Sequence, residues 1–379
     1  MSTASTDTDP LDNPRRPTVV PWRIGMLIDW AHATRPMIDF VDAAKLAIEQ
    51  AQAAGRIDRP VEWVERKVYG GPNAATLDVL EAFRDLVYDQ KVLGVIGPSL
   101  PDDMAACAPD FDKAGVPVLS MGGTLSLSSP YLFQVPNGSY VDEIRMIVNH
   151  AKAAGIGSIA LIRDLSMMGE EYSATFSLAM REAGLRIAGT YGIAPSPSMA
   201  ELRDAVHAMR ATGAEALMSI TVSIHRHMVA VLEETGWNPA KLMVCNFVAA
   251  IPDFDGPEAF EGWVGVDQFD EANPVFARMV DDFAARYGRR SGHAYMAIGY
   301  DIGRVLARGL AMMAPSTPDG LRAGLEKVRL LPAAAGGAGT VISFARNQRR
   351  GYNGNYLVRR TVENGVNRVI GGMLDGIGD

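Results

Sequence analysis

The sequence contains little cysteine and no long apolar run. Its 379 residues include 2 cysteines, Cys107 and Cys245. Two cysteines so far apart predict neither a disulfide framework nor a metal-ligand cluster, so we expect both to be small buried side chains. No apolar stretch reaches the roughly 18–20 residues that a membrane-spanning helix requires. The sequence therefore argues against a metal centre and against membrane insertion.

Positive charge is also scarce. Lys and Arg number 36 against 44 Asp and Glu, which gives a net charge of −8. That charge opposes nonspecific attraction to nucleic acid or anionic lipid, so neither is an expected partner. Two basic doublets lie near the end of the chain, Arg349-Arg350 and Arg359-Arg360. We interpret them as solvated strand edges rather than as a polyanion site.

Motifs of catalysis and phosphate binding are missing as well. Gly155-Ile156-Gly157 precedes a predicted strand, whereas a dinucleotide-binding glycine motif follows one, and neither a Walker A sequence nor a G-x-S-x-G elbow occurs. His225-Arg226-His227 places two imidazoles at a helix start, where they diverge, which favours a solvated surface over a zinc site. The acidic pairs Asp102-Asp103 and Glu170-Glu171 also begin helices, which suits caps and the helix dipole. We expect no enzyme, no cofactor and no metal.

The sequence does contain a repeated alternation of strands and helices. A chain of 379 residues is long enough for two domains of typical size. Its hydrophobic fraction of 48% and charged fraction of 21% are typical of a soluble globular protein. The alternation starts with an apolar strand at 22–28 and begins again at 157–163. This pattern predicts an α/β fold with doubly wound sheets.

The stretch from Val92 to Thr124 organises the first half of the chain. It reads as an apolar strand at 92–96, a Gly-Pro loop at 97–101, a helix at 102–114 and a second strand that stops at Met121-Gly122-Gly123-Thr124. Such a right-handed βαβ unit places both loops at the carboxyl edge of one parallel sheet. Open α/β sheets bind small ligands at that edge.

This stretch also resembles a known family. The residues GVIGPSLPDDMAACAPDFDKAGVPVLSMGGT match, without a gap, the signature of the leucine/isoleucine/valine-binding proteins, which are the branched-chain solute receptors of ABC importers. The resemblance recurs in the second half and covers most of the chain. It implies the type I periplasmic binding-protein fold, in which two doubly wound parallel-sheet lobes are joined by about three crossover strands and close on a ligand.

The resemblance also implies how the chain is divided. Lobe 1 is expected to comprise residues 22–135 and 270–338, and lobe 2 residues 136–269 and 339–379, with the ligand cleft between them. An Asn-Gly pair at 364 and 365 predicts a tight hairpin turn near the end of lobe 2.

Residues 1–21 are rich in Ser, Thr, Asp and Pro and are expected to form a disordered tail. They lack the apolar core of a secretory signal, whereas the transport members of the family are exported. We therefore expect the chain as written to be cytoplasmic, and periplasmic or extracellular if the true start lies upstream.

The candidate ligand-binding residues are those in loops at the carboxyl ends of strands, facing one cleft. From lobe 1 they are Asp29, Trp30, Ser99, Leu100, Pro101, Gly122, Gly123 and Thr124. From lobe 2 they are Met167, Met168, Thr221, Val222, Ser223, Asn246 and Phe247.

The resemblance implies that a serine hydroxyl of the first loop and groups around the G-x-T turn hold the ligand carboxylate. Thr124 and the Gly122-Gly123 backbone match, but the serine position falls on Pro101, which has neither hydroxyl nor N–H. The family's second-lobe tyrosine falls on Met168, and its acidic residue, which pairs the α-ammonium, falls near Phe247. Burying an unpaired ammonium would cost several kcal/mol. We therefore expect a largely apolar ligand, such as an aromatic or alicyclic acid or an amide.

The sequence thus predicts a solute-binding protein, the substrate-binding component of an ABC-type importer with a permease as partner. The alternative is a cytoplasmic ligand sensor of the same fold, which would resemble the amide sensor of amidase operons and would act on a regulator protein.

Overall fold

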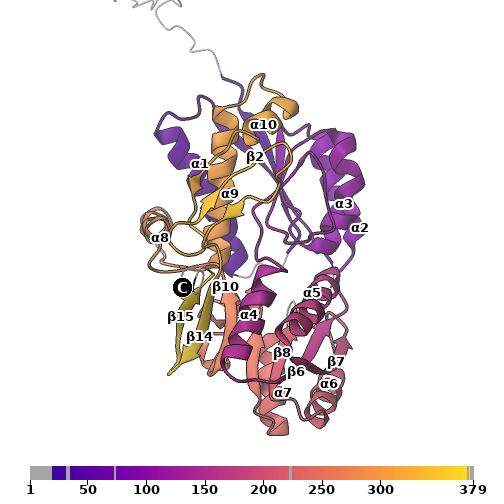
Figure 1. Cartoon of the computed structure of the whole chain (residues 1–379). Helices are drawn as coiled ribbons and strands as arrows, with labels where there is room; N and C mark the ends of the chain where they lie inside the picture. The colour runs from indigo at the N-terminus through magenta and orange to yellow at the C-terminus, as the bar shows by residue number, and fades with distance from the viewer. Residues whose placement is uncertain (1–18, 31–34, 72–73, 222–223, 374, 376–379) are drawn as a thin grey trace, which may run out of the picture.

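The computed structural model describes residues 19–30, 35–71, 74–221, 224–373 and 375 (Figure 1). They form two lobes, drawn one above the other in Figure 1. Most of the predicted tail lies outside the described residues. Within the described ranges, no helix is long and apolar enough to cross a lipid bilayer.

Lobe 1 is built on a five-stranded parallel sheet with the strand order β2-β1-β3-β4-β5. Its strands are β1 (Trp22–Ile28), β2 (Val61–Lys67), β3 (Gly94–Ile96), β4 (Val118–Ser120) and β5 (Leu132–Gln134). All of β1 except Arg23 is buried, as expected for a strand covered on both faces. Its even-numbered residues pack with α1 (Arg35–Ala53) and α9 (Ala294–Ala311), while Leu27 packs with α2 (Thr76–Arg84) and α3 (Pro101–Ala114).

Two further helices, α8 (Pro274–Tyr287) and α10 (Pro318–Leu325), complete lobe 1, and a π-helical turn, Asp85–Asp89, continues α2. The close pair α1 and α9 depends on glycine. A Cβ at Gly299 would lie 2.2 Å from the carbonyl oxygen of Phe40, and one at Gly303 would lie 2.3 Å from that of Ala44. The absence of both side chains therefore lets the two helix backbones touch.

Lobe 2 is built on a seven-stranded sheet with the order β15-β14-β10-β9-β8-β6-β7. Its strands are β6 (Ser158–Asp164), β7 (Arg186–Ile193), β8 (Ala216–Ile220), β9 (Ala240–Met243), β10 (Trp263–Asp267), β14 (Val358–Glu363) and β15 (Val366–Gly372). One face carries α4 (Asp142–Ala153) and α5 (Met167–Ala183), and the other carries α6 (Met199–Ala211) and α7 (His225–Thr235). Two 3₁₀ turns, Cys245–Ala250 and Pro257–Phe260, precede β10. The parallel strands of this sheet and the helices between them form the second strand–helix alternation predicted from the sequence.

The hairpin β14–β15 has the predicted turn. Glu363 pairs with Val366, and the two residues between them, Asn364 and Gly365, have φ of 53° and 70°. Positive φ at both central positions is the geometry that an Asn-Gly pair favours. The prediction of a tight turn is confirmed.

The chain passes between the lobes three times, and the last passage follows a small three-stranded sheet. Its strands are β11 (Leu331–Pro332), β12 (Val341–Ile342) and β13 (Tyr352–Asn353). Ile342, Phe344 and Tyr352 belong to the apolar core of lobe 1. We therefore propose that the last lobe boundary falls after β13 rather than at residue 338. The overall architecture is the expected one, two doubly wound α/β lobes joined by three crossings.

The interpretation of the arginine doublets as solvated strand edges is wrong. Arg360 is 1% exposed, and its guanidinium pairs with Glu271 at 2.7 Å and lies 3.9 Å above the ring of Phe269. The reason is that β14 turns this residue inward, where it meets the second crossing. Of the two histidines expected at a solvated surface, His227 is exposed, but His225 is buried, with its ring nitrogen Nε2 3.3 Å from the carbonyl oxygen of Thr221.

Candidate ligand-binding site between the lobes

The predicted first-lobe loops lie where the two lobes meet. The loops after β1, β3 and β4 share the carboxyl edge of the lobe 1 sheet, and α5 of lobe 2 approaches it beside α3 (Figure 1). The N–H of Met167 donates to Asp102 Oδ1 across this interface at 3.4 Å. The structure therefore brings the start of α5 of lobe 2 against the carboxyl edge of the lobe 1 sheet.

Asp29 holds the neighbouring loop through one of its two carboxylate oxygens. Its side chain is 1% exposed, and Oδ2 accepts hydrogen bonds from the N–H groups of Ser99 at 2.7 Å and Leu100 at 2.8 Å. Pro101 is the first residue of α3, a position where its missing N–H costs nothing. The two amides that this loop could offer a ligand are thus satisfied by Asp29.

A second buried carboxyl, Asp103, lies against Asp29. Its Oδ1 accepts from the N–H of Gly71 at 2.9 Å. Burial, with the charge of Asp29, raises the pKa of Asp103 to about 8, and burial raises the pKa of Asp29 to about 6. Asp29 Oδ1 and Asp103 Oδ2 have no donor. A proton on one carboxyl lets it donate to the other, so at neutral pH the pair holds one proton.

The loop after β4 is fixed by bonds to its carbonyl groups. Gln134 Nε2 donates to the carbonyl oxygens of Gly122 and Thr124, both at 3.0 Å. Arg350 Nη1 donates to the carbonyl oxygen of Gly123 at 3.0 Å. A Cβ at Gly122 would lie 2.8 Å from the carbonyl oxygen of Ser99 and 2.0 Å from Met104 Sδ, so this turn needs glycine.

The N–H and hydroxyl groups that follow in this loop point to a carboxylate of lobe 2. Glu171 accepts from Thr124 Oγ1 at 2.7 Å and from the N–H of Leu125 at 3.0 Å. It also accepts from the N–H of Ser126 at 3.3 Å and from the Ser126 hydroxyl. Thr124, one of the predicted residues, therefore binds Glu171 in this conformation.

Asp102, Asp103 and Glu170 lie in the first turns of their helices, as expected, but none of them is the N-cap residue. The residue before α3 is Leu100, which makes no side-chain cap, and α5 is capped by Ser166 through the N–H of Gly169. Asp103 and Glu171 instead make the contacts described above. They are functional candidates that the sequence interpretation missed, because each contacts a loop far away in the chain.

Arg350 is a third residue that was missed. It was expected at a solvated edge, but its Nη1 also reaches the carbonyl oxygen of Thr124 at 3.2 Å, and burial lowers the pKa of its guanidinium. Beside it, the rings of Tyr140 and Tyr172 lie 4.1 Å apart, and Tyr172 Oη donates to Glu143 Oε1 at 2.8 Å. These groups add polar and aromatic character to the region around the crossings.

The other predicted residues are distributed between the interface and the cores. Trp30 is half-buried, edge-to-face with Tyr295 at 5.9 Å. Met168 and Phe247 are buried in the two apolar clusters of lobe 2, Phe247 against Phe260 at 6.2 Å. Thr221 is buried at the end of β8. The predicted residues Val222 and Ser223 and the side chain of Asn246 lie outside the described part of the structure.

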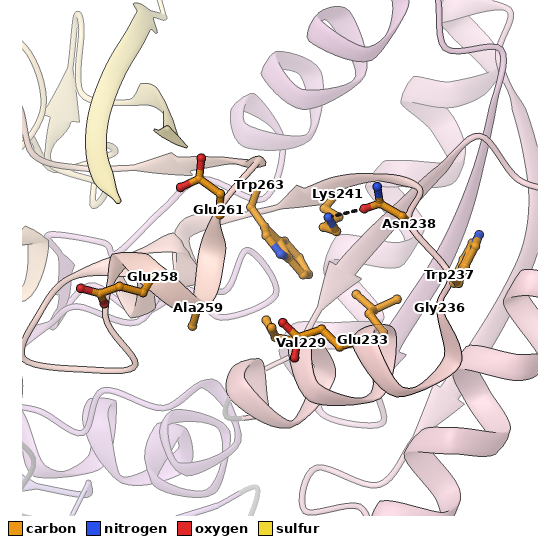
Figure 2. A pocket seen from close by; sticks show the side chains of 11 residues that line it. Val229, Glu233, Gly236, Trp237, Asn238, Lys241, Glu258, Ala259, Glu261 and Trp263 are labelled. Atoms are coloured by element: carbon orange, nitrogen blue, oxygen red, sulfur yellow. Dashed lines mark hydrogen bonds between the residues drawn. The ribbon is translucent and has the colours of Figure 1, made fainter. Parts of the chain in front are cut away.

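Two surface hollows lie away from these loops. Figure 2 shows one of about 260 Å³ on lobe 2, where Trp237 and Trp263 flank Lys241, whose Nζ donates to Asn238 Oδ1 at 2.7 Å. The other, about 530 Å³, lies on lobe 1 and is lined by Ser128, Ser129, Pro130, Tyr131, Arg322, Arg346, Asn347 and Arg349. None of the predicted ligand-binding residues lines either hollow. Among the described residues, no three His, Cys, Asp or Glu side chains are grouped to hold a metal ion.

The fold defines a class, that of two-lobed α/β proteins whose lobes are joined by three crossings. Residues 21–365 match the model of the periplasmic binding protein family. The chain therefore belongs to that family. A comparison with curated protein sequences finds no match.

Solved structures share the fold at low sequence identity. The branched-chain amino acid transporter substrate-binding protein LivJ from Streptococcus pneumoniae, in complex with isoleucine, is 18% identical, with a TM-score of 0.78 over 93% of this chain and 100% of that chain. The leucine-binding protein LivK from Thermotoga maritima is 16% identical, with a TM-score of 0.74 over 93% and 98%. An ABC transporter substrate-binding protein from Desulfitobacterium hafniense, in complex with Leu, is 17% identical, with a TM-score of 0.74 over 93% and 100%.

Proposed function

We propose that the chain is a solute-binding protein that captures a small, largely apolar ligand by closing its lobes, as the substrate-binding component of an ABC-type importer. The observation that carries the proposal is the two-sided interface, at which donors of lobe 1 meet a carboxylate of lobe 2. A ligand that contacts both lobes supplies differential free energy for the closed conformation. The titles of the structural relatives name leucine and isoleucine as their ligands, which supports a transport role by analogy.

The ligand of this chain is proposed to differ from those amino acids. Asp29 satisfies the amides of Ser99 and Leu100, and Glu171 satisfies the donors at Thr124 and Leu125. Both sets of donors that could hold a ligand carboxylate are therefore already bonded to carboxylates of the chain itself. Within the expected class of aromatic or alicyclic acids and amides, this favours neutral amides.

The apolar part of the proposed ligand would contact the side chains near these polar groups. Trp30 and Leu100 belong to lobe 1, and the half-buried Met167 is the first residue of α5 in lobe 2. A mostly apolar lining with a few oriented polar groups is typical of small-molecule sites. Methionine adapts its shape to irregular ligands.

The alternative function is a cytoplasmic ligand sensor of the same fold that acts on a regulator protein. The bonds of Asp29 and Glu171 to these donors favour this alternative as well. They disfavour a carboxylate ligand, and a sensor that resembles the amide sensor would bind a neutral amide. The two functions differ in compartment, so export of a reporter fused to the full-length native gene distinguishes them. Export supports the importer, and retention in the cytoplasm supports the sensor.

A thermal-shift screen tests the proposed ligand class. Benzamide and alicyclic amides are expected to raise the melting temperature, because a ligand that binds only the folded chain stabilises it. Leucine, isoleucine and valine are expected to leave it unchanged. A micromolar affinity for leucine would contradict the proposal.

A further inference from the structure

We propose that Glu171 determines ligand specificity, because its carboxylate occupies a carboxylate receptor on lobe 1 and thereby excludes carboxylate ligands from this edge of the cleft. The receptor is formed by Thr124, Leu125 and Ser126. The inference rests on the proposed function, since it states which members of the proposed ligand class can enter.

The receptor presents four donors to one carboxylate. Thr124 Oγ1 and the Leu125 N–H lie 2.7 Å and 3.0 Å from Glu171 oxygens, and Ser126 contributes its N–H at 3.3 Å and its hydroxyl. Consecutive backbone N–H groups with nearby hydroxyls form a concave site suited to an anion. Hydrogen bonds to a charged acceptor are also about twice as strong as those between neutral groups.

The receptor is held in place by bonds that do not involve Glu171. Gln134 Nε2 donates to the carbonyl oxygen of Thr124 at 3.0 Å, and Arg350 Nη1 donates to the same oxygen at 3.2 Å. The side chain of Thr124 is 0% exposed. The positive charge of Arg350 also interacts with Glu171. The donors should therefore keep their positions, and their preference for an anion, when Glu171 is replaced.

Glu171 and its neighbour Glu170 contact different lobes. Glu170 lies in the first turn of α5 and Glu171 follows it, and successive helical residues point about 100° apart. Glu170 pairs with Arg163 of its own lobe at 2.9 Å and is 63% exposed. Glu171 reaches the other lobe. The pair thus offers a matched control, one carboxylate that occupies the receptor and one that does not.

Occupation by a tethered carboxylate has a direct consequence for ligands. A group attached to the same molecule competes with an effective concentration on the order of millimolar or more. A free carboxylate must displace Glu171 and leave it without its four donors. A neutral amide does not compete for the receptor and binds elsewhere in the cleft.

The test compares benzoate with benzamide, two ligands that differ only in this group. Both are titrated by calorimetry into the full-length wild type, Glu171→Ala, Glu171→Gln and Glu170→Ala. Glu171→Ala should bind benzoate at least about tenfold more tightly than wild type, roughly the effect of one charge-assisted hydrogen bond. Benzamide affinity should change much less, and Glu170→Ala should behave as wild type with both ligands.

Titration of the same proteins with acetate gives a readout that does not depend on the apolar part of the ligand. In Glu171→Ala, acetate should shift the amide resonances of Leu125 and Ser126, whereas in wild type and Glu170→Ala it should not. If Glu171→Ala does not fold, as judged by circular dichroism, Glu171→Gln carries the test, because its uncharged side chain retains the size of glutamate.

The outcomes separate the inference from the proposed function. Unchanged benzoate affinity and unshifted amides in the folded variants would overturn the role of Glu171, whatever benzamide does. A gain in acetate or benzoate binding without any benzamide binding would support the receptor and contradict the proposed amide ligand.

Discussion

Asp103 and Asp29 are two carboxyls buried side by side, 0% and 1% exposed, in the lobe that carries most of the predicted site. If both carboxyls were ionised, their two oxygens without donors would repel each other. A proton on one of the carboxyls removes this repulsion, because it can be donated to the other. Burial raises the pKa of both carboxyls, and the charge of Asp29 raises that of Asp103 further, so we assign to Asp103 the proton that the pair keeps at neutral pH. Because the ordinary pKa of an Asp is about 3.9, folding raises its proton affinity.

Asp103→Asn should therefore stabilise the protein at alkaline pH. Between pH 4 and about 8 the folded chain keeps a proton at Asp103 that the unfolded chain releases, so the free energy of unfolding falls as the pH rises through this window. Asparagine has no proton to lose. Its amide can still accept from the N–H of Gly71 and donate to Asp29. We expect a gain of about 1–3 kcal/mol at pH 8, the cost of a buried polar group without a partner.

Thermal melts of wild type and Asp103→Asn from pH 5 to pH 9 measure this difference. The melting temperature of the variant should exceed that of wild type by an amount that grows with pH. Asp281→Asn, which alters an exposed carboxylate paired with Arg290 at 2.8 Å, is the control. A variant less stable than wild type at every pH would contradict the shared proton.

The contacts of Asp103, Glu171 and Arg350 could not have been predicted from the sequence. Arg350 binds carbonyl groups more than 200 residues away, and Glu171 binds a loop 45 to 47 residues before it. An acidic pair at a helix start has an adequate local explanation as a cap or a dipole partner. Only the three-dimensional arrangement shows that Ser166 already caps α5 and that Glu171 is free to reach lobe 1.

At the scale of single elements, local sequence patterns were sufficient to predict a strand and a turn. The apolar run of β1 and the Asn-Gly turn of β14–β15 are determined by residues that are neighbours in the chain, and both predictions are confirmed. The last lobe boundary, which we propose to lie after β13, does not follow from such a pattern. It depends on Ile342, Phe344 and Tyr352 packing into the distant core of lobe 1, which strand periodicity does not encode.

The contribution of the packing between α1 and α9 to the stability of the fold can be tested by mutation. Gly299→Ala should destabilise the chain by about 1–3 kcal/mol or more, because the new Cβ would lie 2.2 Å from a backbone oxygen that cannot move without shifting α1. Chemical denaturation followed by circular dichroism measures the change. Gly157→Ala is the control, since its Cβ would meet only the flexible Glu215 side chain, at 3.4 Å. Equal stability of Gly299→Ala and wild type would show that α1 and α9 can separate.

At the scale of the molecule, the crossings fix one lobe to the other. Gln268 joins two of them, because its Oε1 accepts from the N–H of Gly138 at 2.5 Å and its carbonyl oxygen accepts from the N–H of Gly336 at 2.7 Å. Arg360 ties β14 to Glu271 at the second crossing. Away from the crossings, the polar contacts described at the interface involve Asp102 and Glu171. Lobes linked in this way can rotate about the crossings when those few contacts break.

Lobe closure should therefore be visible in solution. With saturating benzamide, the radius of gyration from small-angle scattering should fall, and the fluorescence of Trp30 should change, since this residue is half-buried beside the interface. Trp30→Phe should remove most of the fluorescence response. Trp237→Phe should retain it, because Trp237 lines the separate hollow on lobe 2. If the ligand binds but neither the radius of gyration nor the Trp30 signal changes, the protein does not work by closing, and the importer analogy fails at its mechanism.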